Sequence, residues 1–378
     1  MRVAIVYDCL FPWTVGGAER WYRNLAERLA ASGHEVTYLT LRQWDAPPAL
    51  PPALPGVTVV AVGPRMALYR HGKRRILPPL VFGAGVLLHL LRHGGRYDHV
   101  HLASFPFFSL LAAGLLRPLH RYRIGVDWHE VWSRDYWRDY LGAAGIVGWW
   151  VQKLCARVPQ SAFGFSRLHL DRLASLGRKG THLTGEYAGG AHPSQSAAAP
   201  PTLVYAGRMI PEKRVPLFVE AVAEARNSRP DLVARIFGDG PERAEVAERI
   251  AELRLGDAVS LEGFVAADVL EGAMASAAAI VQPSAREGYG MVVVEASARG
   301  VPAVVVAGPD NAATELVEEG VNGFVAAEPS AGSLAAAMLR AVDGGAALRR
   351  STEGWYAANA RRLSLDGSLD RILAAIGA

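Results

Sequence analysis

Short Val- and Ile-rich stretches alternate with segments of helical spacing along the whole chain. In the first half we expect strands at residues 2–10, 35–41, 57–63, 97–104, 122–130, 161–166 and 180–186. A second series is expected at residues 202–208, 231–238, 259–265, 279–283, 302–307 and 322–327. After the first strand, residues 18–31 have the apolar spacing of a helix that stops near Gly33. This alternation predicts the α/β class with parallel sheets.

The two series of strands are separated by a segment of linker composition. Residues 191–201 are small, polar and proline-bearing. We therefore expect one Rossmann-like domain over residues 1–190, a linker over 191–201 and a second such domain over 202–355. The tail, residues 356–378, is expected to be helical and to cross back to the first domain. Because open α/β sheets bind ligands beyond the carboxyl ends of their strands, two facing sheets would form a deep cleft.

Composition supports a globular protein and excludes several classes. Of the 378 residues, 51% are hydrophobic and 20% charged, which provides a sizeable core. Two cysteines, Cys9 and Cys155, cannot build a disulfide framework or a zinc site, so a cytoplasmic location is expected. Asp8 interrupts the first apolar run, which therefore does not fit a signal peptide. The longest apolar stretch, residues 76–91, contains two prolines and is too short for a membrane span.

The segment Glu287-Gly-Tyr-Gly-Met-Val-Val-Val-Glu295 is the strongest candidate for a binding site. It follows an apolar strand and leads into a helix, so Gly290, Met291 and Val292 would present backbone amides without helical partners. Such a helix start attracts anions. Carboxylates on either side would repel a phosphate alone, but they can hold the hydroxyls of an attached sugar. The segment thus predicts a nucleotide-sugar site.

Basic and glycine residues follow other strand ends. Arg208 and Lys213, after the first strand of the second domain, could converge on a diphosphate in place of a metal counter-ion. Gly16 and Gly17 follow the first strand of the chain and permit a tight turn with close backbone approach. An ordinary strand–helix turn is the alternative for this pair. The spacing is not the dinucleotide fingerprint, and the partial match at Gly83-Ala-Gly85 lies in a helical segment.

A histidine ends the fifth predicted strand, in the sequence Asp127-Trp-His129-Glu130. Its place at the carboxyl end of a strand favours a functional role over a structural one. The chain contains no Asp-x-Asp and no cluster rich in His or Cys, so nothing visible requires a divalent metal or another cofactor. Neither a Gly-x-Ser-x-Gly elbow nor a Walker phosphate loop is present.

Taken together, these motifs resemble the family-4 retaining glycosyltransferases, which have the GT-B fold of two facing Rossmann-like domains. The resemblance covers essentially the whole chain. Its most specific parts are Glu-x7-Glu at 287–295, Gly-Arg-x4-Lys at 207–213 and Phe-Gly-Asp-Gly-Pro at 237–241, which contains Gly238. The chain departs from the family pattern at 183–188, Leu-Thr-Gly-Glu-Tyr-Ala, where many members carry an Asn-Gly-Val-Asp-like turn.

The resemblance implies that residues 1–190 bind the acceptor and residues 202–355 bind a nucleotide-sugar donor. Arg208 and Lys213 would bind the donor diphosphate. Glu295 would hold the ribose, while Glu287 would contact sugar hydroxyls. Gly238 would belong to the donor site as part of the loop at 237–241.

The remaining implied contacts surround the sugar and the base. The amides of residues 290–292 would cap a phosphate or sugar oxygen, and His129 would lie beside the anomeric carbon. Gly16 and Gly17 would approach the phosphates from the first domain. Phe264 and Val265 match the edge where the nucleotide base packs in this family.

From the family we expect transfer of a hexosyl group with retention and without metal, UDP-hexose being favoured as donor and GDP-mannose second. Neither Glu287 nor Glu295 is placed as a nucleophile, so front-face displacement is expected in place of the glycosidase double displacement. Two alternatives remain open. A sugar-nucleotide epimerase shares the architecture and would change the donor without an acceptor, and a non-catalytic nucleotide-sugar binder would do neither.

Two features bear on the acceptor, which is expected to be a glycan, a lipid-linked sugar or a natural product. Residues 65–75 hold five Arg or Lys within a net charge of +4, and residues 128–150 hold seven Trp or Tyr. The first is either a solvated loop or a patch facing an anionic acceptor or membrane. The second is either core or an acceptor surface. Peripheral membrane contact at the inner face is therefore one expectation, and nucleic acid is not expected.

Overall fold

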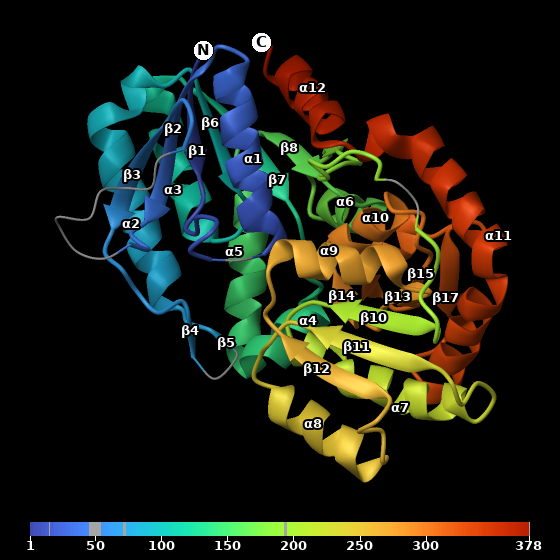
Figure 1. The fold of residues 1–378 in the computed structure, drawn as a ribbon. Coiled ribbons are helices and arrows are strands. Elements are labelled where there is room, and N and C mark those ends of the chain that lie inside the picture. The colour runs from blue at the N-terminus through green and yellow to red at the C-terminus, as the bar shows by residue number, and fades with distance from the viewer. Residues whose placement is uncertain (15, 45–53, 71–72, 193–194, 378) are drawn as a thin grey trace. The chain divides into compact units, whose positions relative to one another are not determined.

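The computed structural model describes residues 1–14, 16–44, 54–70, 73–192 and 195–377. The chain forms two compact units, one of Met1–Ala188 with Leu365–Ala378 and the other of Gly189–Ser364 (Figure 1). The second unit thus extends nine residues beyond the expected limit at 355. The segment that belongs with the first unit begins at Leu365 instead of 356.

Unit 1 is built on a seven-stranded parallel sheet in the order β3-β2-β1-β6-β7-β8-β9. Its strands are β1 (Arg2–Val6), β2 (Glu35–Leu41), β3 (Val57–Gly63), β6 (His99–Ala103), β7 (Arg123–Trp128), β8 (Ser161–Gly164) and β9 (Thr181–His182). A separate two-stranded ladder joins β4 (Tyr69–Arg70) and β5 (Lys73–Arg74). Parallel strands require crossover helices, which explains the helical segments between them.

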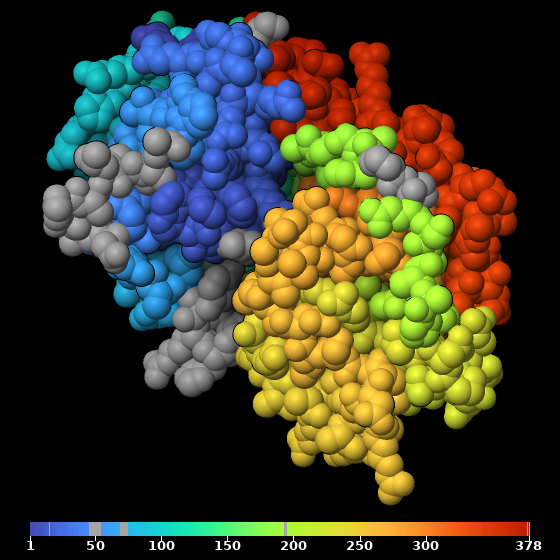
Figure 2. Space-filling view, viewed as in Figure 1, coloured from blue at the N-terminus to red at the C-terminus, as the bar shows by residue number. Residues whose placement is uncertain are grey.

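The helices of unit 1 cover both faces of this sheet. In Figure 1, α1 lies in front of the sheet and α3 behind it. The helices are α1 (Gly17–Ala31), α2 (Leu77–His93), α3 (Phe107–His120), α4 (Arg134–Leu141), α5 (Gly145–Arg157), α6 (Arg167–Ser175) and α12 (Leu365–Ile376), with short 3-10 turns η1 (Gly94–Arg96) and η2 (Gly142–Ala144). The C-terminal α12 packs against α1, so the red end of the chain adjoins blue atoms in Figure 2.

Unit 2 repeats the plan with six parallel strands in the order β12-β11-β10-β13-β15-β17. They are β10 (Thr202–Ala206), β11 (Val233–Phe237), β12 (Val259–Gly263), β13 (Ala279–Gln282), β15 (Ala303–Val306) and β17 (Gly323–Ala326). Short β14 (Arg286–Glu287) and β16 (Asp310–Asn311) pair separately. The helical segments are η3 (Pro211–Lys213), α7 (Val215–Arg226), α8 (Arg243–Glu252), α9 (Ala267–Ser276), α10 (Met291–Ser297), η4 (Ala312–Leu316) and α11 (Ala331–Leu363).

All thirteen strands expected from the sequence occur in the two main sheets, although several are shorter than expected. The first, expected over 2–10, leaves the regular ladder after Val6, while Cys9 and Leu10 stay fully buried. Burial and strand pairing end at different residues, and the apolar pattern reports only burial. The two sheets and the helices around them are those of the predicted doubly wound α/β architecture.

The Gly83-Ala-Gly85 sequence lies inside α2 and serves packing. A Cβ on Gly85 would lie 1.9 Å from the carbonyl oxygen of Val62, and one on Gly83 would lie 2.5 Å from Cβ of Phe108. These glycines let α2 approach β3 and α3 closely. Their role is therefore packing, in agreement with the prediction that they are not a dinucleotide-binding motif. Within the described residues, no helix combines the length and apolar character needed to cross a bilayer.

Candidate active site

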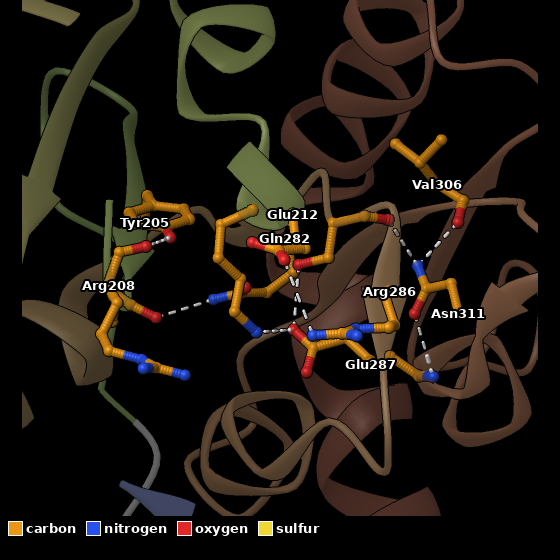
Figure 3. Close-up of polar contacts among 12 residues, drawn as sticks. Tyr205, Arg208, Glu212, Gln282, Arg286, Glu287, Val306 and Asn311 are labelled. Carbon is orange, nitrogen blue, oxygen red and sulfur yellow. Dashed lines mark hydrogen bonds and ion pairs between the residues drawn. The ribbon is translucent and has the colours of Figure 1, made fainter. Parts of the chain in front are cut away.

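In unit 2 the predicted donor residues gather beyond the carboxyl ends of β10 and β13. Gln282 Nε2 donates to the carbonyl oxygen of Ala206 at 2.9 Å and ties the ends of these two strands together. Asn311 Nδ2 donates to the carbonyl oxygens of Ser284 at 3.1 Å and Val306 at 2.8 Å (Figure 3). These buried amides fix the loop between β13 and β14, and β14 carries Glu287, the first glutamate of the predicted signature.

Lys213 and Glu287 contact each other directly. The Lys213 ammonium donates to Glu287 Oε1, and Ser284 Oγ donates to the same oxygen at 2.9 Å. Both charged side chains are less than one-fifth exposed. Arg286 and Glu212 form a second ion pair at 3.7 Å between the same two segments. The carboxylate is thus held in one position by a cation and a hydroxyl.

Arg208 is exposed, and its side chain has no ion pair within the part of the chain that the structure describes. Its backbone is fixed, because the Tyr205 hydroxyl donates to the Arg208 carbonyl oxygen at 2.8 Å. The loop after β11 supports it from the other side. Gly238 has φ +117°, and a Cβ there would lie 2.0 Å from the carbonyl oxygen of Gly207. Gly240 is equally confined, with 2.2 Å to the Met209 carbonyl oxygen.

The second half of the signature begins α10. Gly290 precedes this helix with φ +106°, a conformation that side chains other than glycine rarely adopt. Met291 and Val292 form the first helical turn, whose amides lack intrahelical acceptors. Glu295 lies about one turn further along and is half-buried. The order of strand, loop and helix start matches the sequence expectation.

Phe264 and Val265 follow β12 and differ in environment. The Phe264 side chain is 75% exposed, whereas Val265 is half-buried against a small apolar cluster that contains Phe237 and Ile280. Gly263, with φ +71°, turns the chain before them. An exposed aromatic ring beside the strand ends of unit 2 is available to a flat ligand group.

In unit 1, His129 lies directly after β7 between two aromatic rings. Its imidazole stacks on Phe165 with centroids 4.5 Å apart and planes 2° apart, and the Tyr22 ring meets it edge-on at 5.8 Å. Nδ1 lies 3.4 Å from Glu186 Oε1. The buried Nε2 has no hydrogen-bond partner within the described residues. The ring is therefore fixed in orientation, and its Nε2 is available to a ligand.

The charge of His129 follows from two opposed effects. Burial lowers its pKa, but the hydrogen bond and charge of Glu186, with smaller contributions from Asp127 and Glu130, raise the pKa above its usual value overall. Asp127, fully buried on β7, accepts from Trp21 Nε1 at 2.7 Å and lies 2.9 Å from His101 Nε2. Burial raises the Asp127 pKa, and His101 with His129 and Trp21 lower it below the usual value overall.

Gly16 and Gly17 begin α1, as the sequence suggested. A Cβ on Gly16 would lie 2.3 Å from Glu19 Oε2, whereas Gly17 has nothing within 4 Å of that position. The buried Glu19 carboxylate thus occupies the space beside Gly16 at the start of α1. The expected approach of this turn to phosphates stays a prediction.

The aromatic run at 128–150 is mostly internal. Trp128 and Trp137 are buried, while Trp132 contacts Tyr136 and Tyr140 with centroids 4.7 and 5.1 Å away. In this run Trp150 is the large aromatic side chain that is more than half exposed. Core packing thus explains most of the run. In the basic stretch at 65–75, residues 71 and 72 lie outside the described residues, and only the backbone is described for 69, 70, 73 and 74.

Sequence reasoning missed three residues that organise these sites. Glu186 orients His129, and Ser284 and Asn311 fix Glu287 and its loop. Glu186 lies in the segment 183–188, which departs from the family pattern. This departure was the one feature of the sequence that could have pointed to a role for Glu186. No group of three or more His, Cys, Asp or Glu side chains suited to a metal ion occurs within the described residues.

Two family models match consecutive parts of the chain. The model of Glycosyltransferase Family 4 matches residues 15–179, and that of Glycosyl transferases group 1 matches residues 192–355. The alpha-D-kanosaminyltransferase of Streptomyces kanamyceticus is 29% identical over 46% of this chain and 44% of its own length, so this match spans less than half of that relative. The glycogen synthase of Mycobacterium tuberculosis is 25% identical over 93% of this chain and 88% of its own length.

A solved structure shows the same fold. The Anabaena protein HepE, crystallised with UDP and glucose, superposes with a TM-score of 0.70 at 18% identity, with 100% of both chains covered. Each predicted motif occurs inside the segment matched by the corresponding family model, and both sheets have the expected parallel topology. The chain belongs to the family-4 glycosyltransferases of the GT-B fold.

Proposed function

We propose that the protein is a retaining glycosyltransferase that moves a hexosyl group from a nucleotide diphosphate sugar to a hydroxyl acceptor without a metal. The observation that carries the proposal is the Lys213–Glu287 ion pair beside Arg208 in unit 2. Two cations alone, such as Arg208 and Lys213, would bind any anion. A carboxylate held against one of the cations adds an acceptor for sugar hydroxyls.

The ion pair does not prevent either side chain from binding donor. An ammonium has three donors, and Glu287 uses one of them. The second carboxylate oxygen of Glu287 is left for a hydroxyl, since Lys213 and Ser284 both contact Oε1. Lys213 would then lie between the diphosphate and Glu287 and reduce their mutual repulsion. Arg208, exposed on a fixed backbone, can add a forked contact to the same phosphates.

In this mechanism the bond between the anomeric carbon and the diphosphate oxygen breaks as the acceptor oxygen bonds to the same face of that carbon. The acceptor proton passes to the departing diphosphate oxygen. Arg208 and Lys213 neutralise the charge that grows on the diphosphate, which stabilises the transition state. His129, with its unpartnered Nε2 and a pKa raised by Glu186, would hold a sugar or acceptor hydroxyl beside the reacting centre.

For the donor we propose UDP-hexose first and GDP-mannose second, with the base packing on Phe264 and Val265 and the ribose held by Glu295. The Anabaena protein HepE was crystallised with UDP and glucose, and the S. kanamyceticus relative carries the name of a kanosaminyltransferase. These relatives support a hexosyl donor. The acceptor class we propose is a glycan, a lipid-linked sugar or a natural product.

A ligand screen followed by product analysis tests the proposal. A nucleotide sugar at one hundred times its dissociation constant should add about 2.7 kcal/mol of stability, which a thermal-shift screen detects. With donor and a hydroxyl acceptor, NMR of the product should show the anomeric configuration of the donor. An inverted product would reject the stereochemistry. If the sugar of the donor is converted when no acceptor is present, the protein is an epimerase. If a nucleotide sugar binds but is transferred to no acceptor, the protein is a non-catalytic nucleotide-sugar binder.

A further inference from the structure

Three helices of unit 1 are apolar on both sides. α2, α3 and α5 pack side by side, and their inner faces enter one core cluster through side chains such as Phe82, Leu110 and Cys155. A helix that covers a soluble protein normally has a polar outer face. Here the outer sides also carry large apolar side chains. We define the outer leucine face as Leu77, Leu80, Leu88 and Leu91 of α2, Leu115 and Leu119 of α3, and Val147, Trp150 and Leu154 of α5.

The spacing of these residues places them in continuous stripes. Leu77, Leu80, Leu88 and Leu91 recur at three, eight and three positions, which keeps them within one side of α2. Each is at least 42% exposed, and Leu115 on α3 reaches 70%. Single exposed leucines need no explanation, but a contiguous apolar patch on adjacent helices marks an interaction surface.

The helices that carry the outer leucine face have basic but no acidic side chains, whereas the neighbouring α4 carries exposed Asp135 and Asp139 beside Arg138. α2, α3 and α5 contain no Asp or Glu, and over residues 46–126 Asp98 is the only acidic residue against ten Arg or Lys. Asp98 is itself paired with Arg2 at 2.8 Å. Exposed arginines stand at or just beyond the ends of these helices, at positions 75, 92, 96, 117, 121 and 157.

From this combination we infer that the outer leucine face docks onto an anionic lipid bilayer. The leucines would enter the boundary between headgroups and acyl chains, Trp150 would lie at headgroup depth, and the arginines would contact lipid phosphates. A second copy of the chain fits less well, because a two-fold interface would bring arginines of like charge together. This inference does not depend on the proposed function. From the sequence, membrane contact is expected through residues 65–75 and 128–150, whereas the face inferred here is carried by α2, α3 and α5 and shares only Arg75, Val147 and Trp150 with those stretches.

Vesicle sedimentation with the full chain tests the inference. Vesicles of equal phosphatidylglycerol and phosphatidylcholine should pellet the wild-type protein at low salt, and 0.5 M NaCl or pure phosphatidylcholine should reduce binding at least tenfold. Paired Leu88→Glu and Leu115→Glu substitutions should lower the partition coefficient at least tenfold. The control Leu253→Glu, at an exposed leucine of unit 2, should leave it unchanged. Absence of wild-type pelleting with anionic vesicles, or an equal loss in the control, would overturn the inference.

A second measurement covers the case in which the glutamate variants fail to fold. An environment-sensitive dye attached at Leu115→Cys should shift to the blue when anionic vesicles are added, and the same dye at Leu253→Cys should not. The native cysteines are buried and should react little. Light scattering without lipid distinguishes self-association. A wild-type dimer that the paired glutamates dissociate would assign the outer leucine face to a second copy and reject the membrane.

Discussion

Lys213 and Glu287, separated by 74 positions in the chain, form an ion pair on which a third group, the Ser284 hydroxyl, also converges. The sequence predicted Lys213 as a ligand of the donor diphosphate and Glu287 as a ligand of the sugar hydroxyls, but it gave no reason to expect the two side chains in contact. The contact means that the cation and the carboxylate are positioned before any ligand arrives. Preorganised charge of this kind is the main way in which enzymes stabilise developing charge.

Replacing Lys213 with Ala should lower kcat roughly a hundredfold, since loss of one such contact costs about 3 kcal/mol in the transition state. The remaining carboxylate of Glu287 would then repel the diphosphate. Steady-state kinetics with the donor found by the ligand screen measures the effect. Lys179→Ala, which removes an exposed lysine of unit 1, is the control and should be neutral. Turnover of Lys213→Ala close to wild type would remove this residue from the mechanism.

Glu186→Gln should lower the pKa of His129. The hydrogen bond and charge of Glu186 are the largest influences that raise this pKa, against burial that lowers it. Because the pKa in the folded protein is raised, the pair stabilises the fold below the unfolded pKa. That contribution is lost as pH rises through the folded value. NMR titration of the His129 ring, assigned with His129→Gln, measures the change. Glu130→Gln, a weaker influence, should shift the pKa less, and a larger shift there would contradict this account.

Gly238→Ala should destabilise unit 2 by about 2 kcal/mol or more. The residue has φ +117°, and a Cβ would lie 2.0 Å from a backbone oxygen that cannot rotate away. The loop that carries Arg208 would have to move, so nucleotide binding should weaken as well. Chemical denaturation and nucleotide titration check both effects. Gly256→Ala, where nothing lies within 4 Å of the added carbon, should change stability by less than about 0.5 kcal/mol.

Stability should fall as pH decreases below about 6.5, partly because of His99. Burial and the neighbouring His101 and Arg123 lower the His99 pKa to about 3. Between these values the unfolded chain binds a proton that the folded chain does not, so acid favours unfolding by up to about 1.4 kcal/mol per pH unit. Denaturation midpoints from pH 7 to 4 measure the slope. His99→Gln, which cannot titrate, should flatten it, and an unchanged slope would exclude His99 as the cause.

Phe264→Ala should weaken binding of the nucleotide about tenfold and leave the fold intact. The ring is 75% exposed, so its removal costs little packing, whereas stacking of a base on an aromatic ring is worth about 1–3 kcal/mol. Calorimetric titration with UDP or GDP gives the affinity, and the unfolding temperature reports on the fold. Leu253→Ala, at another exposed apolar position of unit 2, should affect neither. Wild-type affinity in Phe264→Ala would place the base elsewhere.

The sequence by itself determined the class and the plan of the fold. Alternation of apolar strands and helical segments reports burial, and burial is what a parallel sheet covered on both faces imposes on every strand. For the same reason Arg208, Lys213 and Glu287 could be placed near strand ends of one sheet, since the carboxyl ends of parallel strands meet at one edge. The glycines at 238 and 290 were also marked, although their positive φ angles were not.

Only the tertiary structure decided which of these side chains touch. Contacts such as Lys213 with Glu287 join residues far apart in the chain, and their geometry depends on how strands and loops pack, which no local pattern encodes. Glu186 acquires its importance because β7 and the segment after β9 bring it to His129. The exposure of Leu88 and Leu115 is likewise invisible in the sequence, where apolar helices predict core. Packing uses one side of each helix, and the other side is left to solvent or to a partner.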